Sequence, residues 1–290
     1  MMILALALLG GAVILGAYDG IQKGFGLWQF FIRFAVMLLL LKAFDILFFD
    51  AEREIREGED KSMSRKDEIK SAYRSLGKTH GIYDGQMLGT TRIGRFMLKH
   101  VWNMTREDAL EYQAQAFEPI PSDFAGKLLE VPVGTGVLSM PVWATLPGAN
   151  ITCLDYSEKM MEAAQNRARN KGIKNVKFLQ GDVGALPFED ESFDIVISLN
   201  GFHAFPDKEA AYRETFRVLK PGGTFCGCFY VKGENRRTDW FIDKLYRPKG
   251  FFTPPFETAD SLRERLGGMY AQVEVSAMES IACFRCVKEK

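Results

Sequence analysis

The chain has 290 residues, of which 47% are hydrophobic, so it can bury a sizeable core and is not an intrinsically disordered protein. Lysine plus arginine and aspartate plus glutamate both number 37, which gives a formal net charge of zero. A chain without overall positive charge lacks the field that holds nucleic acid phosphates, and we expect no nucleic acid partner.

Two apolar runs open the sequence. Residues 1–18 contain no charged side chain, and a second apolar run extends from Leu27 to Phe49. Each is near the roughly 20 residues that a spanning helix needs. No basic residue precedes the first run and no convincing cleavage site follows it, which argues against a secretory signal peptide. We therefore expect two transmembrane helices, a hairpin over residues 1–49, with a pair of buried helices in a soluble protein as the alternative.

Charges beside the two runs predict the orientation of this hairpin. The short connection between the runs holds only Lys23 as a basic residue, whereas the stretch after the second run, residues 50–79, is rich in lysine and arginine. Because positive charge favours the cytoplasmic side, the rest of the chain should face the cytoplasm at the cell membrane. Residues 50–79 mix both charge signs, which is typical of a charged juxtamembrane linker.

Residues 80–123 are expected to form a helical cap ahead of the main domain. Within them Arg92, Arg95, Lys99 and His100 recur at helical spacing. These side chains could meet lipid headgroups, and a solvated helix face is the alternative explanation.

From Phe124 onward, strand-like and helix-like patterns alternate. The runs KLLEV, NITCLD, NVKFLQGD, FDIVISLN and GGTFCGCFYV are separated by helical stretches such as SEKMMEAAQNRARN. Repeated β–α units imply a parallel sheet with helices on both faces. The final runs, AQVEVSAM and SIACFRCVK, follow each other too closely for a crossover helix and should form an antiparallel pair at the sheet edge. Residues 124–290 are therefore predicted to be α/β, a Rossmann-like doubly wound sheet of about seven strands.

Acidic residues and glycines at strand ends suggest a nucleoside site. Glu130 ends the first strand, and Gly134 and Gly136 follow in a turn where a ligand can approach the bare backbone. Asp155 ends the next strand, 21 residues after Gly134, a spacing at which a carboxylate accepts hydrogen bonds from a ribose diol. A binding site for NAD would show the same glycine turn and the same acidic residue. However, Ser139 replaces the third glycine of the dinucleotide fingerprint, which weakens the NAD interpretation.

Four ordered motifs resemble those of class I S-adenosylmethionine-dependent methyltransferases. They are EVPVGTG, LDYSEKMMEAA, GDVGALPFEDESFDIVIS and RVLKPGGTF, and the resemblance is dense from Phe124 to about Lys232. The earlier stretch GIYDGQMLGTTRIGRFMLKHVWNM is similar to the N-terminal cap of quinone-biosynthesis methyltransferases. The sequence departs from the family at Pro132, where glycine is usual, so the turn should be stiffer there. The resemblance implies S-adenosylmethionine as the cofactor.

The resemblance also implies roles for individual residues around the transferred methyl group. Glu130 and the turn from Gly134 to Gly136 would contact the methionine part of the cofactor. Tyr83 would close over the cofactor, and Asn200 would border the methyl donor.

For the nucleoside part, the resemblance assigns the ribose hydroxyls to Asp155. Met160 would lie beside the adenine. Asp182 would accept from the exocyclic amine of the adenine, and Val183 would supply a backbone amide.

Direct displacement of a methyl group from a sulfonium requires positioning and no covalent nucleophile. A general base helps only where the acceptor is protonated. His203 lies just beyond the strand that ends near the methyl donor, and we predict it as the catalytic base, with a structural role as the alternative. Cys283 and Cys286, three apart in a strand, would face opposite sides, so no metal site is expected.

The expected membrane hairpin bears on the methyl acceptor. Two apolar helices are unnecessary for methyl transfer, so position near the bilayer should matter. We expect a membrane-anchored enzyme that methylates a small, lipophilic acceptor, either a quinone precursor or a phospholipid amine. The alternatives are a methyltransferase of a soluble metabolite or protein, and a nucleotide-binding interaction module without catalysis.

Overall fold

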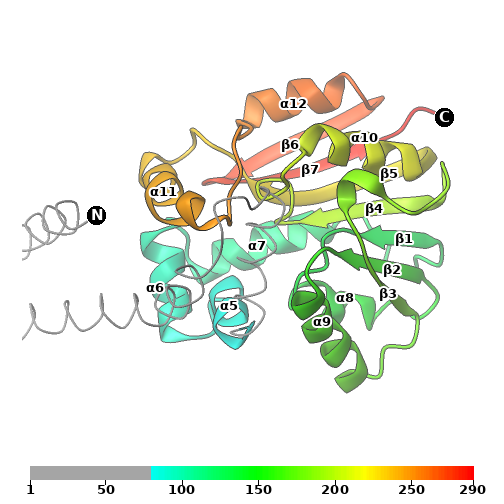
Figure 1. Ribbon diagram of the computed structural model, residues 1–290, viewed down its shortest axis with the longest axis horizontal. Helices are drawn as coiled ribbons and strands as arrows, with labels where there is room; N and C mark the ends of the chain where they lie inside the picture. Colours follow the sequence, from blue (N-terminus) through cyan, green and yellow to red (C-terminus); the bar gives the residue numbers. More distant parts are fainter. Residues whose placement is uncertain (1–79) are drawn as a thin grey trace, which may run out of the picture. The chain divides into compact units, whose positions relative to one another are not determined.

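The structure, a computed structural model, describes residues 80–290, all of which belong to the unit Met63–Lys290 (Figure 1). The transmembrane hairpin expected over residues 1–49 and the linker expected over residues 50–79 lie outside the described residues. Within residues 80–290, no helix combines the length and the apolar character needed to cross a bilayer.

Three helices precede the sheet: α5 His80–Met87, α6 Arg92–His100 and α7 Arg106–Phe117. Helices α6 and α7 each begin after a threonine, because its hydroxyl can satisfy one of the amides left unpaired in a first turn. Thr91 accepts from the amide of Gly94 at 2.9 Å. Thr105 and Asp108 form a reciprocal capping box, in which each side chain accepts from the other residue's amide.

The seven-stranded sheet has the order β3-β2-β1-β4-β5-β7-β6. Its strands are β1 Lys127–Glu130, β2 Asn150–Asp155, β3 Val176–Gln180, β4 Phe193–Leu199, β5 Leu219–Tyr230, β6 Gln272–Met278 and β7 Ile281–Val287. Strands β1 to β5 are parallel, and β7 pairs antiparallel with both β5 and β6. The predicted Rossmann-like sheet with its antiparallel pair is confirmed, and β6 forms the edge because β7 lies between β5 and β6.

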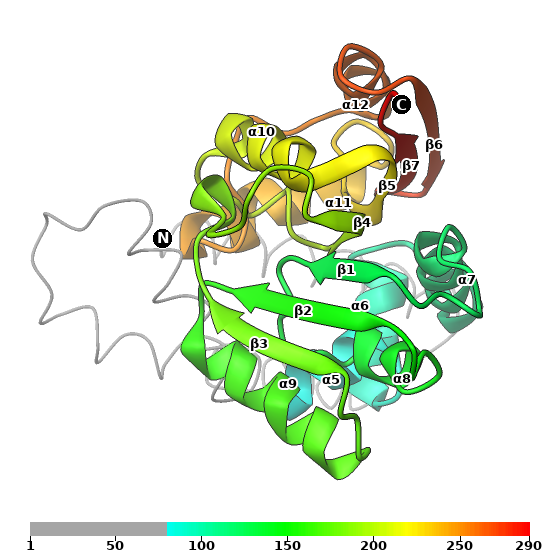
Figure 2. The same cartoon turned by 90° about the vertical axis from the view of Figure 1, so that its right-hand side faces the viewer.

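Further helices cover the sheet on both sides. They are α8 Ser139–Trp143, α9 Glu158–Asn170, α10 Lys208–Val218, α11 Arg236–Phe241 and α12 Ala259–Gly267, with short helical turns η2 Val183–Ala185, η3 Ile242–Tyr246 and η4 Arg247–Lys249. Figure 1 shows α10 and α12 on one side of the sheet and α8 and α9 on the other. Figure 2, turned by 90°, shows α9 alongside β2 and β3.

The core explains why the central strands read as apolar runs. Leu128 and Leu129 of β1 are fully buried, because helices cover both faces of a parallel sheet. Strands β4 and β5 approach closely at Gly227, where a Cβ atom would lie 1.9 Å from the carbonyl oxygen of Ser198. All five cysteines are buried free thiols, and residues 80–290 contain no cluster of His, Cys, Asp or Glu that could hold a metal ion.

Candidate functional site

A cavity opens at the carboxyl ends of β1, β2 and β4, where open α/β sheets bind ligands. Its walls come from α5, the loop after β1, the start of α9, η2 and the loop after β4. All nine residues that the sequence predicted to bind a cofactor line it: Tyr83, Glu130, Gly134, Gly136, Asp155, Met160, Asp182, Val183 and Asn200. The fold thus brings together positions that are more than one hundred residues apart in the chain.

The glycine turn after β1 forms one wall of the cavity. Gly134 and Gly136 have φ angles of +55° and +67°, in the region that favours glycine. Among the described residues, nothing lies within 4 Å of a Cβ built on Gly134, whereas one on Gly136 would lie 2.9 Å from Cγ of Met140. Gly134 therefore leaves open space, and Gly136 lets the turn pack on α8.

Pro132 sits between two residues that stay bonded to neighbouring strands. The amide of Val131 donates to the carbonyl of Ile197, and that of Val133 to the carbonyl of Leu154, both at 3.0 Å. The departure from the family's usual glycine leaves the turn anchored on both sides.

Asp155 fastens the end of β2 to this turn. Its Oδ2 accepts from the amide of Gly134 and its Oδ1 from the amide of Ser157, both at 2.7 Å. The side chain is only 6% exposed, and burial raises the pKa of its carboxyl to about 6. Because each carboxylate oxygen can accept more than one hydrogen bond, Asp155 can still receive a pair of hydroxyl groups from the cavity.

Glu130 is the second carboxylate of the cavity and the more deeply buried one. Its Oε2 accepts from Nε1 of Trp143 at 2.7 Å and from Sγ of Cys153 at 3.2 Å. Burial raises the pKa of Glu130 to about 7. Its charge state near neutral pH is therefore sensitive to a positive group placed beside it.

The nucleoside side of the cavity is built on η2 and α9. Asp182 caps η2, since its Oδ1 accepts from the amide of Gly184 at 2.8 Å. Val183, the first residue of η2, and Met160, in the first turn of α9, are buried against the core.

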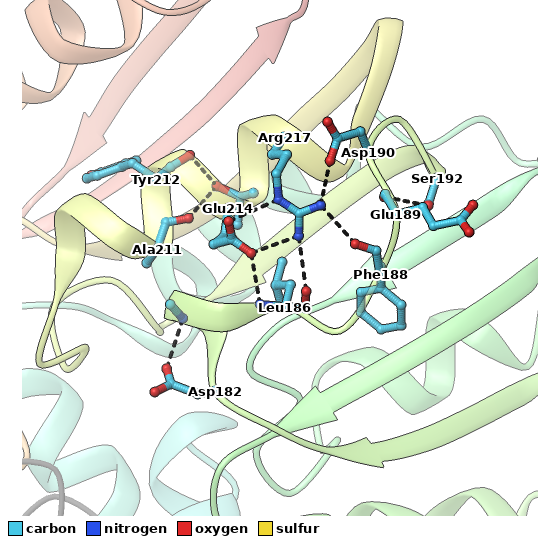
Figure 3. A network of polar contacts seen from close by, with 12 residues as sticks. Asp182, Leu186, Phe188, Glu189, Asp190, Ser192, Ala211, Tyr212, Glu214 and Arg217 are labelled. Atoms are coloured by element: carbon cyan, nitrogen blue, oxygen red, sulfur yellow. Dashed lines mark hydrogen bonds and ion pairs between the residues drawn. The ribbon is translucent and has the colours of Figure 1, made fainter.

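A polar network on α10 holds the loop that follows η2 (Figure 3). The guanidinium of Arg217 donates to the carbonyl oxygens of Leu186 and Phe188 at 3.0 and 2.8 Å, and pairs with Glu214 and Asp190. Glu214 in turn accepts from the amide of Leu186 at 2.9 Å. The network fixes the course of the chain on leaving the cavity.

A second network ties α5 to the glycine turn. Asp84 accepts from the hydroxyl of Thr135 at 2.6 Å and pairs with Arg167 of α9 at 2.5 Å. Arg167 also donates from Nε to the carbonyl oxygen of Thr135 at 3.3 Å. These contacts hold the neighbouring Tyr83 against the cavity, and burial raises the pKa of its phenol. The side chains of Asp84, Thr135 and Arg167 were not singled out from the sequence, although Asp84 directly follows Tyr83 in the stretch similar to the quinone-methyltransferase cap.

His203 does not line the cavity, although its neighbours Gly201 and Ala204 do. Its ring stacks on Phe252 with centroids 4.3 Å apart, and only 8% of the residue is exposed. Burial lowers the pKa of His203 to about 3, so the ring is neutral and weakly basic. His203, the predicted base, is therefore the one predicted site residue that does not line the cavity.

The remaining wall of the cavity is apolar, and sequence reasoning did not find it. Met87 of α5 contributes, as do Ala204, Phe205 and Pro206 from the loop after β4. Asn200, with φ of +53°, directly follows β4 beside this wall, and its backbone N–H donates to the carbonyl oxygen of Cys228 at 2.7 Å. The cavity thus joins a polar part under the glycine turn to an apolar part near Asn200.

Comparison with known proteins finds methyltransferases by sequence and by structure. Residues 128–223 match a family model described as "Methyltransferase domain". The chain is 39% identical over 97 residues to a demethylmenaquinone methyltransferase of Thermus thermophilus, which covers 33% of this chain and 44% of that protein. It is 37% identical over 137 residues to a ubiquinone/menaquinone biosynthesis C-methyltransferase of Bartonella henselae, covering 47% of this chain and 51% of that protein. The chain thus spans about half the length of these relatives, or less.

Among solved structures, the chain resembles phosphoethanolamine N-methyltransferase 2 of Haemonchus contortus in complex with phosphomonomethylethanolamine and S-adenosylhomocysteine. The TM-score is 0.54 at 17% identity, with 69% of this chain and 58% of that chain covered. At this identity the likeness establishes the fold alone.

Proposed function

We propose that this chain, whose residues 128–223 match a methyltransferase domain, is an S-adenosylmethionine-dependent methyltransferase with a small, lipophilic acceptor. The observation that carries the proposal is the convergence of nine cofactor-type residues on one cavity. The methyltransferase relatives support the reaction class.

The residues of the cavity fit such a cofactor chemically. A turn without a Cβ at Gly134 leaves space for a ligand against the backbone, and Asp155 presents carboxylate oxygens beside it. Glu130, whose pKa burial raises to about 7, would be ionised by a neighbouring cation such as an α-ammonium or a sulfonium. Two acidic groups and a neutral backbone turn suit a ligand that carries positive charge and a ribose diol.

The chain's own contribution to methyl transfer is to orient and to exclude water. S-adenosylmethionine, when bound, supplies an electrophilic methyl group that the acceptor displaces directly. Asp155 and the turn at Gly134 would hold the nucleoside, and Tyr83, held in place through Asp84, would cover the cofactor. Asn200 would position the acceptor beside the apolar wall.

The apolar wall supports a lipophilic acceptor, either a quinone precursor or a phospholipid amine. Met87, Phe205 and Pro206 offer no charge with which to hold a polar metabolite. The quinone-biosynthesis relatives favour the first of the two classes. The uncharged residues 1–18 and the second apolar run support anchoring in the cell membrane through residues 1–49, with the described residues facing the cytoplasm.

The test incubates full-length protein with S-adenosylmethionine that carries a labelled methyl group, together with either a lipid extract or an aqueous extract of cells. We expect label to enter a product that partitions into organic solvent, and Asp155→Ala to reduce that transfer strongly. Label confined to water-soluble products would reject the lipophilic acceptor. Cofactor binding with no transfer in either extract would instead favour an interaction module.

A further inference from the structure

Two helical segments far apart in the sequence expose large apolar side chains on the same side of the unit that residues 80–290 form. Ile93 and Phe96 of α6 are 47% and 59% exposed, and Trp240 of α11 is 38% exposed. Figure 1 draws α6 and α11 next to each other on its left-hand side, with β3 on the right. Exposing large apolar side chains to water is unfavourable, and several of them gathered on one surface indicate a site that binds a partner.

Specific hydrogen bonds join the two segments. The guanidinium of Arg237 donates to the carbonyl oxygen of Lys99 at 3.0 Å and to Oδ1 of Asn103 at 2.5 Å. The buried hydroxyl of Thr238 donates to the carbonyl oxygen of Val101 at 2.7 Å. The exposed residues of α6 and of the segment from α11 through η4, Arg236 to Lys249, therefore form one surface, named here the α6–α11 face.

This face is strongly cationic, although the chain as a whole has a net charge of zero. Residues 92–100 and 236–249 together contain eight lysines and arginines and two aspartates. Both aspartates are engaged: Asp239 accepts from the hydroxyl of Tyr230 at 2.8 Å, and Asp243 pairs with Lys232 at 2.9 Å. The cationic side chains that stand exposed around the apolar ones are Arg92, Arg95, Lys99, Arg236, Lys244 and Arg247.

Exposed aromatic rings ringed by cations on amphipathic helices fit the boundary of a bilayer. There apolar side chains enter the acyl region while lysine and arginine reach anionic headgroups. We propose that the α6–α11 face is a docking surface for bilayers that contain anionic lipid, with Ile93, Phe96 and Trp240 entering the headgroup boundary. The proposal rests on the proposed function only for its purpose, since docking needs no methyl transfer.

Docking at this face would present the cavity to the membrane. Helix α5 packs closely on α6: a Cβ on Gly94 would lie 2.0 Å from the carbonyl oxygen of Gly85. Arg95 also donates to the carbonyl oxygen of Thr90 in the turn between the two helices, at 3.2 Å. Because α5 supplies Met87 to the apolar wall, an acceptor dissolved in the bilayer would meet the cavity beside the docked helix.

The test places an environment-sensitive nitrobenzoxadiazole dye on full-length protein in reconstituted vesicles. Phe96→Cys puts the dye on the α6–α11 face, and Leu110→Cys, at a 46% exposed position on α7, is the matched control. The native thiols are buried and so compete little for the dye. Emission is compared in vesicles of phosphatidylcholine alone and in vesicles that also contain phosphatidylglycerol.

We expect phosphatidylglycerol to raise the emission severalfold at position 96 and to leave position 110 unchanged. Adding Lys99→Gln and Lys244→Gln should remove the rise, with circular dichroism checking that the variant is folded. Equal emission in both vesicle types, or the same rise at both positions, would overturn the proposal. A rise that follows protein density at constant lipid composition would also overturn it, by pointing to a second copy of the chain. None of these readouts uses S-adenosylmethionine, so failure of the methyltransferase proposal is recognised separately.

Discussion

Replacing Asp155 by alanine should weaken cofactor binding, whereas its effects on the stability of the fold partly cancel. The carboxylate accepts two backbone amides at 2.7 Å, from Gly134 and Ser157, and we assign it the ribose hydroxyls as well. Loss of charge-assisted hydrogen bonds to the ligand should cost about 1–3 kcal/mol, which is about 5- to 150-fold in Kd.

The effect on the free energy of unfolding combines two opposed contributions. Leaving the amides of Gly134 and Ser157 unpaired costs about 1–3 kcal/mol each. Against this, burial raises the pKa of Asp155 from 3.8 to about 6, and removing so poorly solvated a carboxylate returns about 3 kcal/mol at neutral pH. The two contributions largely offset each other, so the net destabilisation of the fold should be about −1 to +3 kcal/mol.

Calorimetric titration with S-adenosylhomocysteine, together with thermal unfolding, separates the two quantities. Asp155→Asn should bind the ligand as poorly as the alanine variant. Its side-chain NH2 group would face the backbone N–H of either Gly134 or Ser157, and two donors cannot form a hydrogen bond with each other. Asp260→Ala is the control, since that side chain is 95% exposed. If Asp155→Ala were folded and bound the ligand within about twofold of wild type, the assignment of this carboxylate to the cofactor would be wrong.

Four further predictions test the remaining features. Burial raises the pKa of Glu130 from 4.5 to about 7, so between these pH values the folded state holds a proton that the unfolded chain releases. The stability that this proton contributes is present below pH 4.5 and is lost as the pH rises through 7. The free energy of unfolding, measured with denaturant, should therefore fall between pH 5 and pH 8 by about 3 kcal/mol more in wild type than in Glu130→Gln. Equal differences would contradict the burial argument. Burial lowers the pKa of His203 from 6.5 to about 3 and so has the opposite effect: the stability that the neutral ring contributes to the folded state is lost as the pH falls below 6.5. Since His203 lies off the cavity, His203→Ala should lower the unfolding temperature and leave turnover nearly unchanged, whereas loss of a general base would slow turnover about 10²–10⁴-fold. Gly227→Ala should destabilise the fold by about 3 kcal/mol, because its Cβ would meet the carbonyl oxygen of Ser198; wild-type stability in chemical unfolding would refute this. Asp84→Asn should speed the dissociation of bound S-adenosylhomocysteine in stopped-flow measurements, and an unchanged rate would mean that the contacts of α5 do not retain the ligand.

The sequence predicted the sheet and the polar part of the cavity because both depend on local pattern. Glu130 and Asp155 could be placed together, since the carboxyl ends of neighbouring parallel strands meet at one edge. The contacts of Asp84 could not be predicted, because Thr135 and Arg167 lie 51 and 83 residues further along the chain. No local pattern encodes such pairs.

The position of His203 shows a different limit of the sequence. Its place after β4 predicted proximity to the cavity, and its immediate neighbours do line it. Which way one side chain turns in a loop depends on tertiary packing, here on the ring of Phe252, which lies 49 residues away in the chain. For the same reason the apolar wall of Phe205 and Pro206 emerged only from the three-dimensional structure.

The close contact between Gly85 and Gly94 packs α5 tightly against α6. If Tyr83 covers the bound cofactor as proposed, release of the cofactor would require α5 to move, and the close packing of α5 on α6 would couple the two helices in that motion. The ion pair that restrains this motion is within reach of water, since the side chains of Arg167 and Asp84 are 29% and 14% exposed. Exchange of spent cofactor should therefore become faster with rising salt. Exchange should become slower when α6 is docked on a membrane. Release of the spent cofactor, rather than methyl transfer, would then limit the turnover rate of the membrane-bound protein.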